Sequence, residues 1–217
     1  ETPLLTNDGL VIPEIGLKQA LRSKDYLNKV PTIAGSNKDE IKLWLGFSKY
    51  FIETNQSLLS KGIGIPRVEI KDEEKYQFYN DIRSKGWQLR GVQEPLANMF
   101  VAGNENLYAY RYDWDNLRDF FVGDFSKIIG SAHALEIPMI SGDFSLAEEF
   151  AWIIYPRSPS RRFVSKNMMS FWTEFAKNGV PGKSSNDISW EKYNPESDKN
   201  ILHIDEKKDL RIEKLDL

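Results

Sequence analysis

The chain has 217 residues, 41% of them hydrophobic, which is enough apolar material for one globular body with a core of ordinary size. Its 29 basic and 32 acidic residues leave a formal net charge of −3, so no field of one sign favours nucleic acid or another polyanion as a partner. The chain contains no cysteine, which excludes disulfide bonds and thiolate metal sites.

The first predicted strand and helix follow a loop-rich opening over residues 1–29. Residues 30–35 form a short apolar run that is rich in β-branched residues and ends in Gly35, which predicts a buried strand ending in a turn. From Glu40 to about Leu59, apolar residues recur at three- and four-residue spacing, which predicts a helix leaving directly from that turn. These apolar positions are Leu43, Trp44, Phe47, Tyr50 and Phe51.

Two further helices are predicted before the next strand. The acidic run over residues 72–74 suits the first turn of one helix, which we expect to end near Gly86. Another helix is expected to begin around Pro95, a residue tolerated in a first helical turn, and to run toward Gly103. No strand is expected between any of these three helices, the one from Glu40 included.

A second strand and a long helix follow. The aromatic run over residues 107–114 predicts a strand, separated from the first by a mainly helical excursion. An apolar face between Val164 and Phe175 predicts a helix that Gly179 caps and Pro181 stops. Strands that flank helices in this way indicate an α/β sheet.

The tail of the chain alternates apolar residues over 201–204 and again over 210–212. A charged run over residues 205–209 separates the two segments. This pattern predicts two short edge strands around a polar turn.

The chain contains two histidines, His133 and His203, and histidine is the side chain whose titration lies nearest neutrality. His203 lies in an alternating apolar strand, where we expect a half-exposed structural histidine. His133 lies in a loop of small residues over 130–138, where an imidazole can be presented to a cleft. Acid–base chemistry is therefore expected first at His133. Two isolated histidines offer no ligand pair for a metal ion.

Glu40 lies just beyond the first predicted strand. In open α/β sheets the chemistry gathers at the carboxyl ends of strands, so Glu40 and His133 could meet although 93 residues separate them. A carboxylate bonded to one ring nitrogen fixes the tautomer and stabilises the imidazolium that forms when the other nitrogen takes a proton. The alternative is that Glu40 is a surface carboxylate and His133 a satisfied loop histidine.

Four segments resemble a known family. VPTIAGSNKDE (30–40) and GSAHALEIP (130–138) are similar to the segments of type-B carboxylesterases and cholinesterases that hold the triad acid and the triad histidine. LYAYRYDW (107–114) and MMSFWTEFAKNGVPG (168–182) resemble their counterparts in the same order and at similar intervals, and the resemblance runs from about Pro3 to about Ile204. The sequence departs from the family pattern at Ile41, where a glycine usually follows the acid, and at residues 139–142, which replace an aromatic-rich turn.

The resemblance implies that residues 1–217 are the C-terminal part of a single α/β-hydrolase domain, with late sheet strands, cap helices and a C-terminal docking helix. It implies carboxylic ester hydrolysis by a Ser–His–Glu triad, with Glu40 as the acid and His133 as the base. The 217 residues contain neither Gly-x-Ser-x-Gly nor a glycine-rich oxyanion-hole segment. The serine is therefore expected on the N-terminal part of the same enzyme, as a nicked or separate chain. No cofactor is needed.

Further residues near the triad are implied by the same resemblance. Leu43, Trp44 and Phe47 follow the acid, where the resembling enzymes line the substrate gorge, although an amphipathic core face would explain these residues almost as well. Glu136 could be a helix-start carboxylate, but the matching acid in the family is buried behind the active site. We favour that supporting role for Glu136.

The expected partners are the missing N-terminal part and a small-molecule ester with an apolar portion. No apolar stretch approaches the roughly 20 residues of a membrane helix, and the first residues lack the basic and apolar regions of a signal peptide. We expect a soluble chain and leave its location open, including secretion or the periplasm. The rival hypothesis is a non-catalytic binding or adhesion protein on the same fold, but such proteins typically lose triad members.

Overall fold

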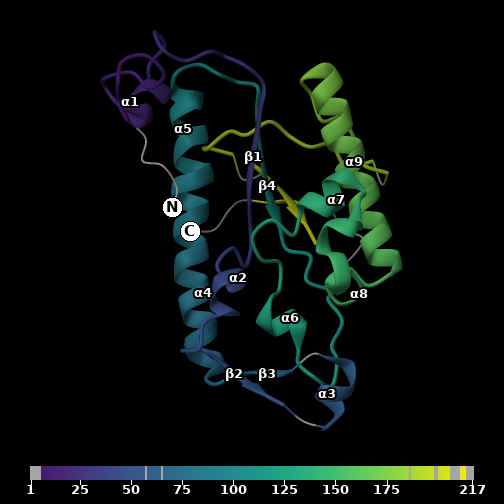
Figure 1. Cartoon of the computed structure of the whole chain (residues 1–217). Helices are drawn as coiled ribbons and strands as arrows, with labels where there is room; N and C mark the ends of the chain where they lie inside the picture. Colours follow the sequence, from purple (N-terminus) through teal and green to yellow (C-terminus); the bar gives the residue numbers. More distant parts are fainter. Residues whose placement is uncertain are drawn as a thin grey trace.

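A four-stranded sheet forms the centre of the computed structural model, which describes residues 6–56, 58–64, 66–185, 187–197, 200–205 and 211–213. The strand order is β1 (Thr32–Asn37), β4 (Leu107–Tyr112), β5 (Ile201–Ile204) and β6 (Arg211–Glu213). The first three strands are parallel, and β6 is antiparallel to β5 (Figure 1). The expected α/β sheet is therefore present.

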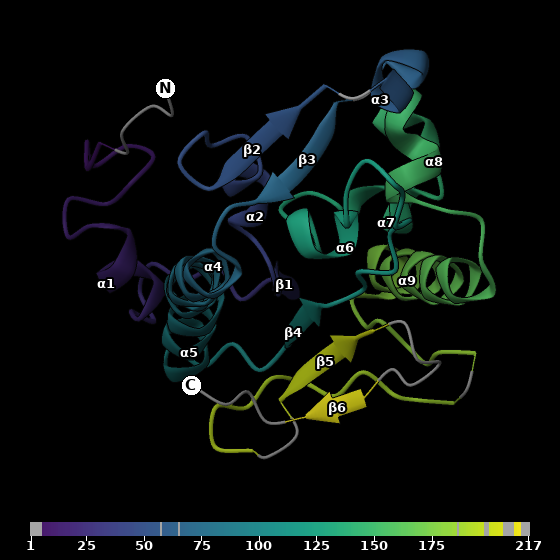
Figure 2. The ribbon, with the colours of Figure 1, turned by 90° about the horizontal axis from the view of Figure 1, so that it is seen from below.

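Helices cover both faces of this sheet (Figure 2). One face carries α7 (Ile137–Ser141) and α9 (Pro159–Asn178), which pack on Tyr108 and Tyr112. The other face carries the helical run that ends in α5 (Glu94–Val101), which packs on Leu107 and Ala109. The alternation of side chains along β4 thus sends aromatic rings to one layer and smaller apolar groups to the other.

The helix predicted from Glu40 to about Leu59 is wrong. The structure has only the short helix α2 (Lys42–Leu45), then β2 (Ile52–Asn55), then α3 (Leu58–Ile63). Strand β2 pairs antiparallel with β3 (Arg67–Ile70), so strands do lie between the predicted helices. Both strands contain β-branched residues, which favour an extended backbone, and their backbone groups pair with each other. In this segment these preferences outweigh the helical spacing of the apolar residues that precede it.

The helices predicted to begin at residue 72 and at Pro95 are present, but they form one continuous run (Figure 1). Helix α4 (Glu73–Gln88) starts where Asp72 accepts a hydrogen bond from the Lys75 backbone N–H at 3.0 Å. The chain passes through Gly86 without a break into the π-helical segment η1 (Leu89–Gln93) and then into α5. Pro95 has no N–H for the preceding turn, so a widened turn is accommodated there.

The predicted long helix is confirmed. Ser158 caps the start of α9 by accepting from the Arg161 backbone N–H at 3.0 Å. Gly179 ends the helix in the left-handed conformation, with φ of 70°. Smaller helices are α1 (Leu17–Leu21), α6 (Phe125–Ile128), η2 (Phe144–Phe150, a 3-10 helix) and α8 (Ala151–Ile154).

Both tail strands exist, but only one of them is an edge strand. Strand β5 is buried between β4 and β6, so of the two tail strands β6 alone lies at an edge of the sheet. Leu210 and most of the predicted polar turn lie outside the described residues. The expectation of a half-exposed His203 is wrong, because its position on β5 leaves the residue only 7% exposed.

Two glycine substitutions test the packing of this fold. A Cβ atom at Gly35 would lie 2.2 Å from the Tyr110 ring, so Gly35→Ala should lower the free energy of unfolding by about 1–3 kcal/mol. A Cβ atom at Gly86 would meet nothing within 4 Å, so Gly86→Ala should raise it by about 0.5–1 kcal/mol. Urea denaturation measures both, and effects of the same sign would contradict the packing described.

Candidate active site

Glu40 and His133 are in direct contact, as the sequence predicts. Their side chains are joined between His133 Nδ1 and Glu40 Oε2 at 2.7 Å, and the His133 backbone N–H donates to the Glu40 carbonyl at 3.3 Å. Glu40 follows the end of β1, and His133 lies between α6 and α7, beyond the end of β4. Because β1 and β4 are parallel neighbours, the loops after them leave from the same edge of the sheet.

The two side chains differ in exposure. The Glu40 side chain is only 4% exposed, whereas that of His133 is 40% exposed. Since Nδ1 faces a carboxylate, the neutral imidazole carries its proton on Nδ1. Among the described residues, none forms a hydrogen bond with Nε2, so this nitrogen is available to take a proton from an incoming group.

Asn37 holds the carboxylate of Glu40 from the other side. The Asn37 backbone N–H donates to Glu40 Oε1 at 2.8 Å, so each carboxylate oxygen has a partner. The Asn37 side-chain amide donates to the Ala132 carbonyl at 2.7 Å and to Glu136 Oε2 at 2.6 Å. One asparagine therefore connects the acid, the histidine loop and Glu136.

Glu136 is half-buried at the start of α7, where its side chain makes no cap and contacts Asn37 instead. Burial and the nearby charge of Glu136 raise the pKa of Glu40, against the hydrogen bonds from the Asn37 backbone and His133, which lower it. Glu136 thus contributes negative potential behind the acid without contacting the imidazole.

The histidine loop contains an unusual backbone conformation. Ala134, the residue after His133, has a φ of 68°, in the left-handed region that alanine rarely adopts. Such a conformation costs on the order of 1–3 kcal/mol and persists only where the surroundings determine it. The loop is therefore held in one geometry by its contacts with the acid loop.

Two tryptophan rings lie against the imidazole of His133. The ring centroid of Trp44 lies 5.3 Å from that of His133, and the centroid of Trp87 lies 5.1 Å from it. These residues are 49% and 41% exposed, respectively. Trp87 lies on α4, and its contact with His133 was not predicted from the sequence. The contact depends on how α4 packs against the histidine loop, and the spacing of residues in the sequence does not indicate this packing.

Leu43 and Phe47, two of the three predicted pocket residues, line an apolar cavity of about 270 Å³. Leu135, two residues beyond His133, lines the same cavity. The third predicted residue, Trp44, is not among the lining residues and instead packs on the imidazole. Other apolar lining residues are Val68, Phe125, Ile128, Ile129, Phe150, Ile153 and Ile154.

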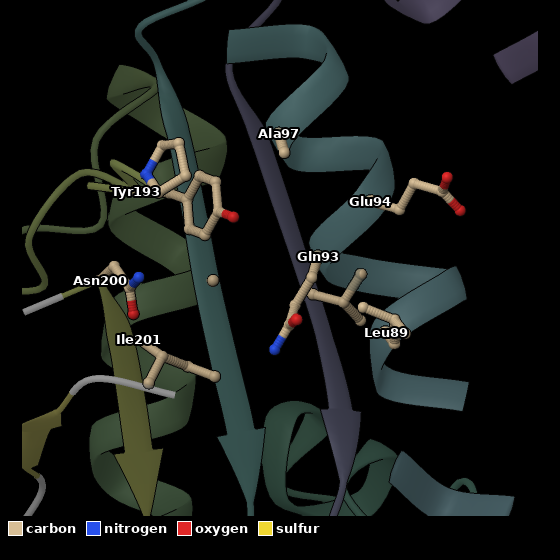
Figure 3. A pocket seen from close by; sticks show the side chains of 10 residues that line it. Leu89, Gln93, Glu94, Ala97, Tyr193, Asn200 and Ile201 are labelled. Atoms are coloured by element: carbon tan, nitrogen blue, oxygen red, sulfur yellow. The ribbon is translucent and has the colours of Figure 1, made fainter. Parts of the chain in front are cut away.

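A second cavity, of about 300 Å³, lies between the α4–α5 run and strands β4 and β5 (Figure 3). Leu89, Gln93, Tyr193 and Asn200 are among its lining residues. None of the predicted site residues lines it, so this cavity is separate from the Glu40–His133 pair.

The other histidine belongs to a buried ion cluster. His203 Nε2 lies 2.6 Å from Asp113 Oδ2, and Arg111 forms two hydrogen bonds to the same carboxylate. Burial opposes ionisation of Asp113, but the hydrogen bonds and charges of His203 and Arg111 hold its pKa below the usual range. This cluster ties the ends of β4 and β5 together.

Within the described ranges, no group of three His, Cys, Asp or Glu side chains could hold a metal ion. In the same part of the chain, no helix has the length and apolar character needed to cross a bilayer.

Comparisons with known proteins agree on one family. The model of the carboxylesterase family matches residues 70–216, more than half of the chain and inclusive of His133. No curated protein matches the sequence. Among solved structures, carboxylesterase EST55 of Geobacillus stearothermophilus is 18% identical with a TM-score of 0.60, and the match covers 92% of this chain and 41% of that chain.

Two esterase structures give similar results. A PNB esterase is 15% identical with a TM-score of 0.57, over 87% of this chain and 37% of that chain. A thermophilic PNB esterase is 17% identical with a TM-score of 0.53, again over 87% and 37%. The chain therefore spans about two fifths of the length of these structures, and at this identity the likeness establishes the shared α/β fold.

The contact between the imidazole and the two indoles can be measured by fluorescence. Because the imidazole of His133 contacts both indoles, His133→Gln should change the intensity or the wavelength of tryptophan emission at constant pH. His203→Gln is the matched control and should leave the emission of these two indoles as in the wild type. Wild-type emission in His133→Gln would contradict the contact.

Proposed function

Because this chain belongs to the carboxylesterase family, we propose that it supplies the acid and the base of a Ser–His–Glu triad that hydrolyses carboxylic esters. Glu40 is the acid and His133 the base. Residues 1–217 form the C-terminal part of one α/β-hydrolase domain, and an upstream segment or chain carries the serine and the oxyanion hole.

The observation that carries this proposal is the 2.7 Å contact between His133 Nδ1 and Glu40 Oε2, across 93 residues of sequence. A triad needs an imidazole with one nitrogen fixed by a carboxylate and the other free for the nucleophile. The buried Glu40 and the half-buried His133 meet both requirements. A surface carboxylate and a satisfied loop histidine, the alternative reading, would not require this pairing.

The mechanism follows from the two ring nitrogens. The upstream serine attacks the ester carbonyl while Nε2 of His133 accepts the hydroxyl proton, and Glu40 stabilises the imidazolium that forms. His133 then returns the proton to the departing alcohol, which leaves an acyl-enzyme. Water, activated by the same nitrogen, releases the acid and restores the serine.

The open edge of β1 supports an upstream partner. Among the described strands, β1 pairs with β4 alone, so its other edge presents unpaired backbone groups. Such an edge is a template for a further strand. In our proposal the N-terminal part of the enzyme adds its sheet there and brings the nucleophile toward Nε2.

The substrate is proposed to be a small ester with an apolar portion. The cavity lined by Leu43, Phe47 and Leu135 is apolar and lies beside the histidine loop. A cavity of this character favours a hydrocarbon group through the hydrophobic effect.

Activity of the protein that carries this chain together with its upstream part tests the proposal. A fluorophosphonate should label its serine, which would exclude the binding or adhesion alternative. His133→Gln should lower kcat about 10⁴-fold or more, and Glu40→Gln should lower it about 10³–10⁴-fold, because the imidazole loses its tautomer and its counter-charge.

The matched control is His203→Gln, which changes the other histidine without touching the proposed triad. Per folded molecule, this variant should keep turnover close to that of the wild type. Near-normal ester turnover in His133→Gln, or no labelling of the intact protein, would overturn the proposal.

The apolar cavity provides a separate test. Leu43→Trp should fill part of it and lower kcat/KM about 10-fold or more for an ester with a bulky apolar group, while an acetate ester changes little. Val101→Trp, at an exposed position on α5, is the control. Equal losses for both esters would argue against the cavity as the substrate site.

A further inference from the structure

We propose that Asp39 is a positioning residue for the triad, which fixes the histidine loop against the acid loop and so sets the distance between Glu40 and His133. This inference rests on the proposed function, because it concerns the geometry of the same site. Asp39 itself contacts neither the imidazole nor the position of the nucleophile and acts only through its neighbours.

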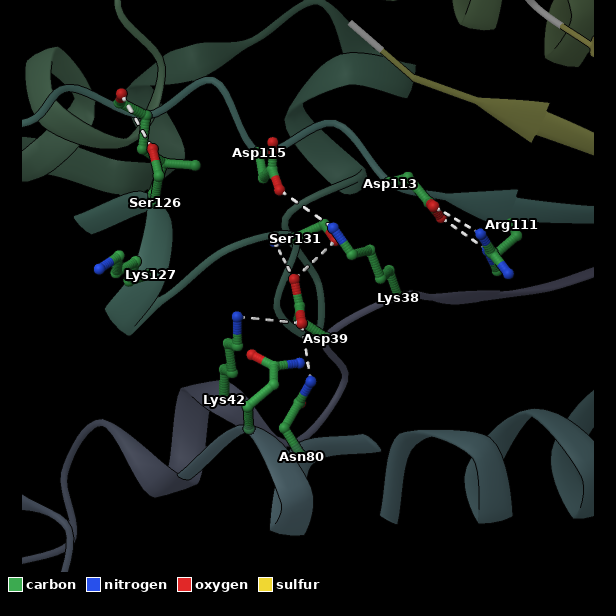
Figure 4. A network of polar contacts seen from close by, with 12 residues as sticks. Lys38, Asp39, Lys42, Asn80, Arg111, Asp113, Asp115, Ser126, Lys127 and Ser131 are labelled. Carbon is green, nitrogen blue, oxygen red and sulfur yellow. Dashed lines mark hydrogen bonds and ion pairs between the residues drawn. The ribbon is translucent and has the colours of Figure 1, made fainter. Parts of the chain in front are cut away.

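The carboxylate of Asp39 is fully buried, at 0% exposure, and joins three separate segments (Figure 4). Oδ2 accepts hydrogen bonds from the backbone N–H of Ser131 at 3.2 Å and from its hydroxyl at 3.3 Å. Oδ1 accepts from the side-chain amide of Asn80 on α4 at 2.7 Å and forms an ion pair with Lys42 of α2 at 3.1 Å. Each oxygen is therefore held by two groups.

Backbone hydrogen bonds transmit this contact to the triad. The Asp39 backbone N–H donates to the Ser131 carbonyl at 3.3 Å, and the His133 backbone N–H donates to the Glu40 carbonyl at 3.3 Å. Two neighbouring residues of the acid loop, Asp39 and Glu40, are thus bonded to Ser131 and His133 of the histidine loop. A displacement of Ser131 must move His133, two residues along the chain.

Gly130 shows how closely the loops approach. It has a φ of 54°, and a Cβ atom there would lie 2.3 Å from Asp39 Oδ2. Only glycine leaves room for the carboxylate at this point. The residue before Ser131 is therefore a glycine at the point where the Asp39 carboxylate comes closest.

A purely structural role is the competing explanation, since the Asp39 carboxylate also links Lys42 of α2 to Asn80 of α4. Lys42 is only 5% exposed, so the loss of one partner would leave a buried charge and destabilise the fold. Removing both charges avoids that cost, which allows the two roles to be separated experimentally.

Asp39→Asn tests the proposal. The amide cannot accept from all four groups, so kcat should fall about 10–100-fold, as expected for a misplacement of roughly 1 Å, while KM changes less than about twofold. The downfield proton resonance of the His133 Nδ1–H should shift or disappear. Asp113→Asn, at a second buried and ion-paired carboxylate, is the control and should lower stability while kcat and the resonance remain.

The double variant Asp39→Asn with Lys42→Met separates positioning from stability. Its unfolding temperature should recover toward the wild type, whereas kcat and the resonance should stay perturbed. If kcat recovers together with the unfolding temperature, Asp39 is structural and the proposal is overturned. An unchanged resonance and kcat in a folded Asp39→Asn protein would overturn it as well.

Ser131→Ala provides a milder variant in case Asp39→Asn does not fold. It removes the hydroxyl donor and keeps the backbone donor, so kcat should fall about 3–10-fold, in line with the loss of one hydrogen bond of about 1 kcal/mol. Wild-type kcat in Ser131→Ala would contradict the proposal. The resonance can be followed even if the protein hydrolyses no ester, so failure of the triad proposal is distinguishable from failure of this one.

Discussion

Parallel pairing of β1 with β4 is the constraint on which the rest of the structure depends. It aligns Asn37 with Tyr112, so the loops after both strands leave from one edge of the sheet. Parallel strands need a long crossover, and the chain uses the α4–α5 run for it, on the face opposite α9. The crossover also brings Asn80 and Trp87 to the loops that carry Glu40 and His133. The parallel pairing of β1 with β4 thus brings together the two loops of the site and the helical layer α4–α5 that packs behind them.

The acid loop is organised by polar side chains on both sides of Glu40. Asn37 bonds the Glu40 carboxylate and reaches Ala132 and Glu136, while Asp39 bonds Ser131, Asn80 and Lys42. Burial of these groups is costly unless every lone pair and proton has a partner. Apart from Asn37 Oδ1, which is buried without a hydrogen-bond partner among the described residues, these side-chain groups find partners, and the partners come from different elements. The cost is therefore lowered only in the complete arrangement. The left-handed conformation of Ala134 is tolerated for the same reason.

Local signals in the sequence were sufficient for elements that end in distinctive residues. Gly179 and Pro181 define the end of α9, Asp72 defines the start of α4, and the aromatic run from Leu107 identifies β4. The hairpin of β2 and β3 was missed because the apolar spacing from Leu43 to Phe51 mimics a helix, and two strands of four residues have little pattern of their own. The burial of His203 and the approach of Trp87 to His133 depend on strand order and helix packing, which no local pattern records.

The exposures of the proposed triad residues are consistent with a nucleophile that approaches from outside this chain. The buried carboxylate of Glu40 bonds the Asn37 backbone N–H and the imidazole, so His133 is the one ionisable side chain that it contacts among the described residues. The imidazole is 40% exposed, and Trp44 and Trp87 beside it are exposed to a similar degree. In the proposed assembly these three rings are covered when the upstream part docks on the open edge of β1. Covering them would exclude water from Nε2 and strengthen its interaction with the serine hydroxyl and with Glu40, because electrostatic interactions grow as the local dielectric falls. Docking and activation of the histidine would then be the same event.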